Sequence, residues 1–495
     1  MTRARRLAAL VAAASLTAVG AAAVGSGPSS ATETRPSAAD HPKLSLQAAS
    51  SHVVLERYGH TVYPNFGIYA VAGDDAFEIR AHRESYHRPI EAELMTDSGA
   101  VPLPEGLVSR WGGLPRFVHL KMTDSSGAVV VDDTRTFCPT GDSVRVRPDA
   151  PDVSTYPYEC STNPFTVGAV YGIDPGFGIP VIEQYGRGMR LPLGRYTATV
   201  WVSKAYRQAL GLRAADTNTT VSVRVVKGDS CIGFRRGCKA TADSASRPGS
   251  SVIPRRPGRT HPDPAKALAD PPLDVRPDLR SLPAFDIGIN RHGYLEFAAT
   301  VWNAGPSPLV VDGFRANQNL MHAYQYFYSA DGTPQGYARA GGMEWDPRHG
   351  HHHWHFRDFA RYRLLDEDKN LVVRSRKEAF CLANTDAVDY TVPGANWRPY
   401  NTDLYTSCGD YSSMAVREVL DTGSGDTYYQ SVAGQSFNIA DLDNGVYYIA
   451  VEANPAGRIY EADTSNDVTY RKIILGGKPD ARTVRVPDVG LIHAP

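Results

Sequence analysis

Short segments in which apolar and polar residues alternate, separated by glycine and proline, recur through most of the chain. In the segment from Leu193 to Val202, a glycine turn leads into alternating threonine and apolar residues. Because successive side chains of a strand point to opposite faces, such alternation favours strands with one buried and one solvated face. The chain of 495 residues contains 44 glycines and 35 prolines and is long enough for two or three domains. We therefore expect an all-β protein.

A proline-rich segment divides the sequence into two β regions. Seven prolines lie among residues 243–272, and proline lacks the N–H group that a central strand donates, so this segment should be an extended linker. We predict a β-sandwich-like domain over 45–228, a cysteine loop and linker over 229–272, a second mainly β domain over 273–476 and a tail over 477–495. The clearest strands are expected at 53–58, 77–82, 117–122, 196–202, 219–226, 294–302, 362–365 and 445–451.

The N-terminal residues have the order of a secretory signal peptide. Arg3, Arg5 and Arg6 precede an Ala/Leu/Val-rich stretch over residues 7–24, and a polar segment follows. This arrangement of charged, apolar and small residues predicts export, with residues 1–31 as the signal peptide. No later segment is apolar enough to cross a bilayer, so stable membrane insertion is not expected.

Cysteine spacing and net charge agree with an extracellular protein. The six cysteines form three pairs that are close in sequence, which suits an oxidising compartment, and no pair has the C-x-x-C spacing of a zinc or redox site. Six cysteines allow 15 pairings; we predict the neighbouring ones, Cys138–Cys160, Cys231–Cys238 and Cys381–Cys408. The net charge of −1 leaves no basic excess to neutralise phosphates, so nucleic-acid binding is disfavoured.

One segment of the second region carries four alternating histidines, His349, His351, His353 and His355. On a strand these imidazoles share one face, about 6–7 Å apart at their α-carbons, and three of them can converge on one metal ion. Imidazole ligands suit copper or zinc, whereas calcium prefers oxygen. A disordered metal scavenger and a solvated strand face are alternatives, although the neighbouring Trp354 requires a core. Periodicity leaves open which three histidines bind.

Several motifs around this segment resemble those of lysyl oxidases. The segment His351-His352-His353-Trp354-His355, followed by Tyr362-Arg363-Leu364-Leu365-Asp366, resembles the copper-binding H-x-H-x-H motif and its downstream Tyr-x-Leu-Leu. Lys377-Glu378-Ala379-Phe380-Cys381-Leu382 is similar to the family's Lys-x-x-Phe-Cys-Leu, and Asp426-Thr427-Tyr428 matches its Asp-Thr-Tyr. The resemblance covers about residues 275–475 and does not include the N-terminal region.

The resemblance implies a lysyl-oxidase-like catalytic domain with a defined set of functional residues. His351, His353 and His355 would bind copper, and Lys377 and Tyr428 would be joined as lysine tyrosylquinone. The implied activity is oxidation of primary amines, as peptidyl lysine or small alkyl amines, by oxygen to aldehydes, with release of hydrogen peroxide and ammonia. The general base is not assigned, because Asp426 could share the face of Tyr428 or serve only a turn.

A run of oxygen donors near the C-terminus resembles the calcium-binding segment of the same family. Glu461, Asp463, Asn466 and Asp467 would supply ligands there, with Asp467 in place of the family's final Asn. Asp278 and the carbonyl of Leu279 would complete the site from upstream. Oxygen ligands fit calcium, although such residues also crowd ordinary hydrogen-bonded turns.

Two other classes of function compete with an oxidase. A secreted metal-binding or adhesive β protein would keep the fold without forming the quinone. A zinc hydrolase would need a base beside the histidines, where only Glu344 is available. Zinc could also occupy the three copper ligands, since metal supply can reverse the order of affinities.

Overall fold

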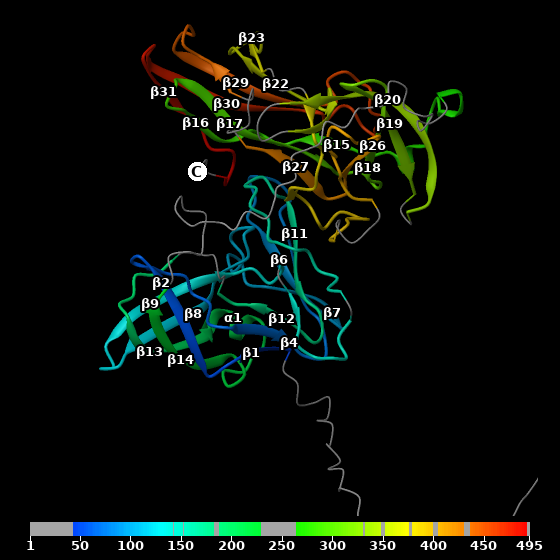
Figure 1. Ribbon diagram of the computed structural model, residues 1–495. Coiled ribbons are helices and arrows are strands. Elements are labelled where there is room, and N and C mark those ends of the chain that lie inside the picture. The colour runs from blue at the N-terminus through cyan, green and yellow to red at the C-terminus, as the bar shows by residue number, and fades with distance from the viewer. Residues whose placement is uncertain are drawn as a thin grey trace, which may run out of the picture. The chain divides into compact units, whose positions relative to one another are not determined.

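The computed structural model describes residues 43–141, 143–151, 153–182, 188–228, 264–329, 332–347, 352–375, 379–398, 404–429 and 436–492. The predicted signal peptide, most of the linker with Cys231 and Cys238, and the candidates His349, His351 and Lys377 lie outside these residues. The chain from Pro42 onward forms one compact unit. Its regular structure is almost entirely β, which confirms the predicted fold class (Figure 1).

Within its described residues, the N-terminal region contains fourteen strands and one short helix. These elements are β1 (Leu44–Ala48), β2 (His52–Tyr58), β3 (Thr61–Val62), β4 (Ile68–Ala72), β5 (Phe77–His82), β6 (Glu91–Thr96), β7 (Gly99–Pro102), β8 (Leu114–Asp124), β9 (Val129–Phe137), β10 (Val144–Arg145), β11 (Gly168–Ile173), β12 (Phe177–Pro180), β13 (Gly194–Val202), α1 (Lys204–Ala209) and β14 (Asn218–Lys227).

Three sheets surround the N-terminal core, with strand orders β1-β4-β12-β10, β11-β5-β6-β7 and β3-β2-β14-β13-β8-β9. Strand β13 shows why these segments form sheets, because Tyr196, Ala198, Val200 and Val202 are buried while the intervening Thr197 is exposed. Most buried apolar residues of the three sheets belong to one hydrophobic cluster. The region therefore has three sheets, where a simple sandwich has two.

The C-terminal region is also built of strands, and two short 3₁₀ turns precede the first of them. Its elements are η2 (Pro264–Lys266), η3 (Leu273–Val275), β15 (Leu279–Ser281), β16 (Phe285–Ile289), β17 (Tyr294–Asn303), β18 (Leu309–Arg315), β19 (Leu320–Tyr328), β20 (Pro334–Asp346), β21 (His353–Arg357), β22 (Ala360–Leu365), β23 (Leu371–Arg374), β24 (Ala379–Phe380), β25 (Asp386–Ala387), β26 (Ala415–Leu420), β27 (Ser424–Tyr428), β28 (Phe437–Asn438), β29 (Gly445–Ala453), β30 (Val468–Lys478) and β31 (Ala481–Arg485).

Three sheets position the candidate residues of this region. One has the order β15-β17-β27-β25, with β16 and β28 also paired to β17. The second has the order β24-β21-β20-β19-β18-β26 and contains the histidine strand, and the third has the order β23-β22-β29-β30-β31. Their inner faces share a hydrophobic core that includes Phe297, Trp354, Phe356 and Phe380. The histidine strand is thus anchored by its own aromatic residues.

The eight strands predicted most clearly are all present, as β2, β5, β8, β13, β14, β17, β22 and β29. The expected tail is wrong over 477–485, because β30 extends to Lys478 and turns back into β31, which pairs with it.

Residues 264–272 of the expected linker also make specific contacts, since the Leu268 N–H donates to the Tyr337 carbonyl at 2.8 Å. Leu268 packs on the core at this point. An apolar residue among the prolines thus ends the linker earlier than expected.

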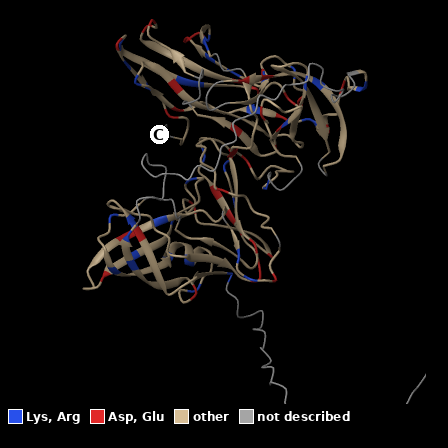
Figure 2. Ribbon diagram, in the orientation of Figure 1, with Lys and Arg blue, Asp and Glu red and all other residues tan. Residues whose placement is uncertain are grey.

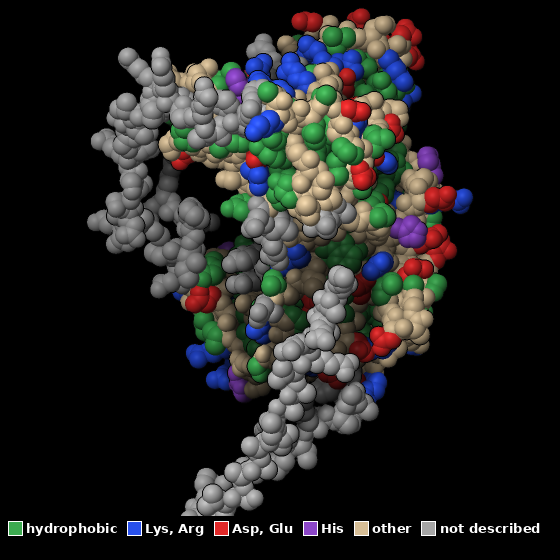
Figure 3. Space-filling view, turned by 90° about the vertical axis from the view of Figure 1, so that its right-hand side faces the viewer, with side chains coloured by type: hydrophobic (Ala, Val, Ile, Leu, Met, Phe, Trp, Pro, Cys, Tyr) green, Lys and Arg blue, Asp and Glu red, His purple; other side chains and the backbone are tan. Residues whose placement is uncertain are grey.

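Charge is distributed without a strong bias on the described surface. Basic and acidic residues are interspersed along the strands of both regions (Figure 2), in keeping with the near-zero net charge. On the face drawn in Figure 3, hydrophobic side chains lie among charged ones. Across the described ranges, the helices are too short to reach from one side of a bilayer to the other.

Candidate functional site

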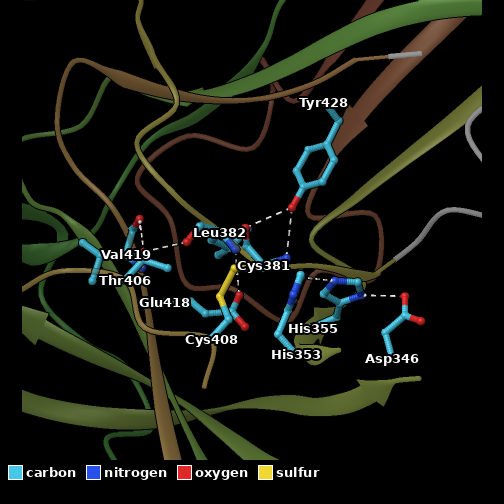
Figure 4. Close-up of a disulfide and its surroundings, with 10 residues drawn as sticks. All are labelled: Asp346, His353, His355, Cys381, Leu382, Thr406, Cys408, Glu418, Val419 and Tyr428. Carbon is cyan, nitrogen blue, oxygen red and sulfur yellow. Dashed lines mark hydrogen bonds and ion pairs between the residues drawn. A yellow bond between two sulfur atoms is a disulfide. The ribbon is translucent and has the colours of Figure 1, made fainter. Parts of the chain in front are cut away.

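The histidine strand β21 places its alternating imidazoles on one face. The Nε2 atoms of His353 and His355 lie 2.9 Å apart, and His355 is only 1% exposed (Figure 4). His352 precedes the strand, is exposed and has a φ of +37°, so it does not share this arrangement. At 2.9 Å, one ring nitrogen can donate to the other, or both can face one metal ion at about 2 Å. The residues present therefore fit an imidazole-bound metal.

A buried carboxylate on the neighbouring strand orients one of these rings. Strand β20 pairs with β21 so that Asp346 lies opposite His353, and the Asp346 Oδ2 atom is 3.4 Å from the Nδ1 atom of His355. A carboxylate at Nδ1 favours the tautomer in which Nε2 is free to bind a metal. Asp346 was not predicted from the sequence, because only the strand register reveals that it faces His355.

Tyr428 ends strand β27 and directs its hydroxyl at the backbone of Cys381 (Figure 4). The Tyr428 hydroxyl donates to the Cys381 carbonyl at 2.9 Å and accepts from the Cys381 N–H at 3.0 Å. Its ring meets Phe380 edge-on, with ring centroids 4.9 Å apart. Lys377 lies outside the described residues, but Cys381 follows it by only four residues in the sequence. The phenol therefore contacts the described segment that begins two residues after the predicted cross-linking lysine.

Backbone pairing connects this segment to the histidine strand. Strand β24 pairs with β21, and Phe380 lies opposite Phe356. Cys381 forms a disulfide with Cys408, whose carbonyl accepts a hydrogen bond from the Trp354 N–H at 3.0 Å. Both predicted disulfides within the described residues, Cys138–Cys160 and Cys381–Cys408, are therefore present. The second disulfide joins the segment that Tyr428 contacts to the loop that contacts the histidine strand.

Two buried carboxylates lie within electrostatic range of the phenol. Asp426 is 2% exposed and Glu418, on β26, is fully buried, with its Oε2 atom accepting from the Leu382 N–H at 2.9 Å. Burial raises the pKa of Tyr428 well above its ordinary value, and the charges of Asp426 and Glu418 raise it further. The phenol is therefore neutral near pH 7 unless a cation is close to it. Asp426 is two residues from Tyr428 on the same strand, and its effect on the pKa of Tyr428 fits the expectation that both side chains share one face. The effect of Glu418 on this pKa was not predicted.

The predicted calcium ligands also come together, although they are far apart in sequence. The Leu279 N–H donates to the Glu461 Oε2 atom at 3.2 Å, which joins β15 to the loop before β30. The Asn466 amide donates to Asp278 at 3.0 Å and to Asp463 at 3.2 Å. We call the residues of this group the acidic cluster: Asp278, Leu279, Glu461, Asp463, Asn466 and Asp467.

The acidic cluster concentrates negative charge in a mostly buried place. Burial, followed by the charges of Asp467 and Asp278, raises the pKa of Glu461 to about 8. Burial and the charges of Asp278 and Asp463 raise the pKa of Asp467 to about 7. The Oδ1 atoms of Asn466 and Asp467 are buried and have no hydrogen-bond partner among the described residues. Buried oxygen atoms that repel one another are suited to a divalent cation.

Neither group closes a complete coordination shell within the described part of the chain. No three His, Cys, Asp or Glu side chains there converge closely enough to bind one metal ion. For the histidine strand, the third predicted ligand, His351, is outside the described residues. In the acidic cluster, the Asn466 NH₂ group lies between two carboxylates, and a half-turn of the amide would present its oxygen there instead.

Part of the C-terminal region is similar in sequence to known proteins. Residues 320–483 match the family model of lysyl oxidase. Over 135 residues, or 27% of this chain, the sequence is 31% identical to protein-lysine 6-oxidases of Sus scrofa and Rattus norvegicus, covering 48% and 29% of those proteins. A lysyl oxidase homolog 4 of Mus musculus is 28% identical over 131 residues, which cover 26% of this chain and 15% of that protein.

The matches thus span less than half the length of these relatives. The family-model match includes the histidine strand, β24 and the strand of Tyr428, and it excludes the N-terminal region. Residues 320–483 thus form a domain of the lysyl oxidase family.

Proposed function

We propose that this chain is a secreted, copper-dependent amine oxidase that deaminates primary amines oxidatively through a cofactor formed from Lys377 and Tyr428. The observation that carries the proposal is the position of the Tyr428 hydroxyl on the backbone of Cys381. That backbone continues from β24, which pairs with the strand of His353 and His355. Hydrogen bonds and strand pairing therefore link the phenol, the segment that begins two residues after Lys377, and the strand of His353 and His355, which supports the proposal.

His351, His353 and His355 would hold copper in this proposal. Asp346 supports it by fixing the His355 ring from its Nδ1 side, so that Nε2 faces the site. When present, copper and lysine tyrosylquinone supply the chemistry that converts a primary amine, oxygen and water to an aldehyde, ammonia and hydrogen peroxide. The remaining chemistry depends on how the chain's own residues hold the phenol and move protons.

The Tyr428 phenolate must be stabilised before the ring can react, because burial and two carboxylates disfavour the ionised form. The backbone of Cys381 fixes its hydroxyl on both the donor and the acceptor side. A cation on the neighbouring histidines would lower the pKa of this phenol and favour the phenolate. The disulfide of Cys381 would keep the Lys377 segment at this distance, contributing about 2–4 kcal/mol to stability.

Asp426 and Glu418 are the candidate proton acceptors for the substrate. Both are buried beside Tyr428, and both raise its pKa, so each lies within electrostatic range of the phenol ring. A carboxylate in such a place can take up a proton from a bound amine. Asp426 shares the strand face of Tyr428, which favours it over Glu418 for this role.

The acidic cluster would bind a structural calcium ion. Its support is the hydrogen bonding of the Asn466 amide to both Asp278 and Asp463, together with buried oxygens of Asn466 and Asp467 that lack hydrogen-bond partners among the described residues. The ion would connect the beginning of the domain at Leu279 to the loop that contains Glu461. Its role would be to hold these segments together, away from the chemistry.

Export and substrate class belong to the same proposal. The two disulfides suit an extracellular protein, as does the signal-like N-terminal sequence. The substrate would be a primary amine, either a lysine side chain of a protein or a small alkyl amine, and oxygen would be the second substrate.

The deciding experiment compares Tyr428→Phe with Tyr429→Phe in copper-loaded protein. The wild type should contain a carbonyl-reactive quinone, form peroxide from a primary amine, and yield a cross-linked peptide bearing Lys377 and Tyr428 in mass spectrometry. Tyr428→Phe should lose all three properties and still bind copper. Tyr429 is a matched control, because it is the adjacent tyrosine and is 44% exposed.

Either of two results would contradict the proposal. Full amine oxidation by Tyr428→Phe would show that another group supplies the cofactor. A wild-type protein that binds copper but forms no quinone and no peroxide would favour the metal-binding or adhesive alternative.

A further inference from the structure

One segment of the N-terminal region, residues 161–168, lies along the sheet formed by β17, β27 and β25. The Val167 N–H donates to the Val388 carbonyl at 2.9 Å, and the Tyr390 N–H donates to the Gly168 carbonyl at 3.1 Å. These bonds run between main chains, so they extend the pairing at the end of β25. The N-terminal region thus contacts the domain of the lysyl oxidase family through its backbone.

A buried side chain of this segment reaches further into the same sheet. Asn163 is 1% exposed, and its Nδ2 atom donates to the Thr300 hydroxyl at 2.9 Å. The Thr300 hydroxyl is in turn 2.7 Å from that of Thr427, the residue before Tyr428. The Asn163 Oδ1 atom accepts from the Phe165 N–H at 2.9 Å, which fixes the amide. A continuous line of hydrogen bonds therefore connects the N-terminal region to β27.

The pleat of β27 makes this contact relevant to the phenol. Thr300 of β17 lies directly opposite Thr427, so their side chains share one face of the sheet. Side chains alternate along a strand, and Asp426 and Tyr428 therefore project from the other face. The N-terminal segment holds the back of the strand whose front carries the two candidate groups of the reaction.

Further contacts surround this line of hydrogen bonds. The Ser161 hydroxyl donates to Asp386 of β25 at 3.3 Å, and the Thr166 hydroxyl donates to the Ala387 carbonyl at 3.0 Å. Phe165 is 1% exposed and belongs to a hydrophobic cluster composed mainly of C-terminal residues. The contact thus buries both polar and apolar groups.

We infer that residues 161–168 are a positioning segment for β27, through which the N-terminal region fixes the backbone from which Tyr428 projects. Asn163 and Thr300 are positioning residues in this inference and do not touch the substrate. Without their hydrogen bonds, buried polar groups lose their partners and the strand opens locally more often. The consequence for the quinone rests on the proposed function, but the contact itself does not.

The contact is tested by amide hydrogen exchange in the full chain without added copper. Asn163→Ala and Thr300→Val should each speed exchange in residues 424–428 by about tenfold, and a double-mutant cycle should show that their effects are not additive. Thr300→Ser keeps the hydroxyl and should restore slow exchange. Thr220→Val is the control, because it removes a hydroxyl pair with Thr199 in the N-terminal sheet.

A second readout separates positioning from a general loss of structure. In copper-loaded protein, Asn163→Ala and Thr300→Val should slow quinone formation about tenfold, whereas copper affinity should stay within about twofold, since the histidines lie on another sheet. Equal loss of copper affinity and quinone formation would overturn the inference in favour of general destabilisation.

The exchange result also separates this inference from the proposed function. Unchanged exchange at 424–428 in both variants would overturn the inference even if the wild type is an active oxidase. Faster exchange with restoration by Thr300→Ser would support it even if the wild type forms no quinone, in which case only the proposed function would fail.

Discussion

The histidine strand and the acidic cluster are both candidate metal sites, and the chain assembles them in different ways. His353 and His355 are two residues apart on one strand, and their Nε2 atoms meet at 2.9 Å. In the acidic cluster, Asp278 and Asn466 are 188 residues apart and meet through a side-chain hydrogen bond of 3.0 Å. One site depends on the local geometry of a strand, and the other on the completed fold.

This difference has consequences for what each metal would do. A site on a single strand needs only a neighbouring carboxylate to orient its rings, and it can present an open coordination position for chemistry. A site made from distant segments gains metal-binding free energy only when the fold is formed, so binding stabilises the fold. We therefore expect the histidines to control activity and the acidic cluster to control stability.

Loss of a histidine should have the largest effect on copper affinity and activity. A small effect would contradict the comparison between the two sites. His355→Ala removes a buried ring and should weaken copper binding by more than about 100-fold, with loss of oxidase activity. His352→Ala is the matched control, because His352 is exposed and lies outside the converging pair. Copper titration against a competing chelator measures both. Equal losses in the two variants would show that the alternating face does not define the site.

Calcium should act on unfolding rather than on chemistry. At a calcium concentration of about 100 times Kd, the free energy of unfolding should rise by about 2.7 kcal/mol. Glu461→Gln and Asp463→Asn should remove most of this increase, and Asp443→Asn, at an exposed carboxylate elsewhere, should leave it unchanged. Thermal unfolding with and without calcium is the measurement. A calcium effect that survives both cluster variants would place the ion elsewhere.

The orienting carboxylate should have a smaller effect on copper than a direct ligand. Asp346→Asn keeps the shape of the side chain but weakens the contact with the Nδ1 atom of His355, and it should lower copper affinity by about 10- to 100-fold. Glu344→Gln on the same strand is the control, since its side chain is 50% exposed. If Asp346→Asn binds copper as tightly as the wild type, the carboxylate does not act on the metal ligand.

The smallest expected effect is a pH dependence of stability in calcium-free protein. The pKa of Glu461 is raised from 4.5 to about 8 in the fold, so the folded state holds a proton that the unfolded state releases above pH 4.5. The free energy of unfolding should therefore fall as pH rises from about 4.5 to 8. Calcium should flatten this slope in urea unfolding, and Glu461→Gln should reduce it, with the raised pKa of Asp467 supplying the remainder. A rising slope would contradict the burial of this carboxylate.

The strands that alternate clearly were predictable, but contacts between strands were not. Tyr196 to Val202 alternate in burial as their sequence indicates, and His353 and His355 share a face for the same reason. Asp346 and Glu418 were missed because a carboxylate on another strand has no fixed spacing from the group it serves. The expected tail was wrong because a weakly alternating segment, Ala481–Arg485, becomes a strand once β30 offers it an edge.

The sequence alone determined that this chain would form β sheets, that its histidines would alternate on one strand, and which neighbouring cysteines would pair within the described residues. These properties depend on the period of two along a strand and on short separations in the chain. Only the tertiary structure decided that Tyr428 would meet Cys381, that Asp346 would orient His355, and that Asn163 would reach Thr300. Those contacts depend on strand register and sheet packing, which are set by the burial of many side chains together and by no single motif.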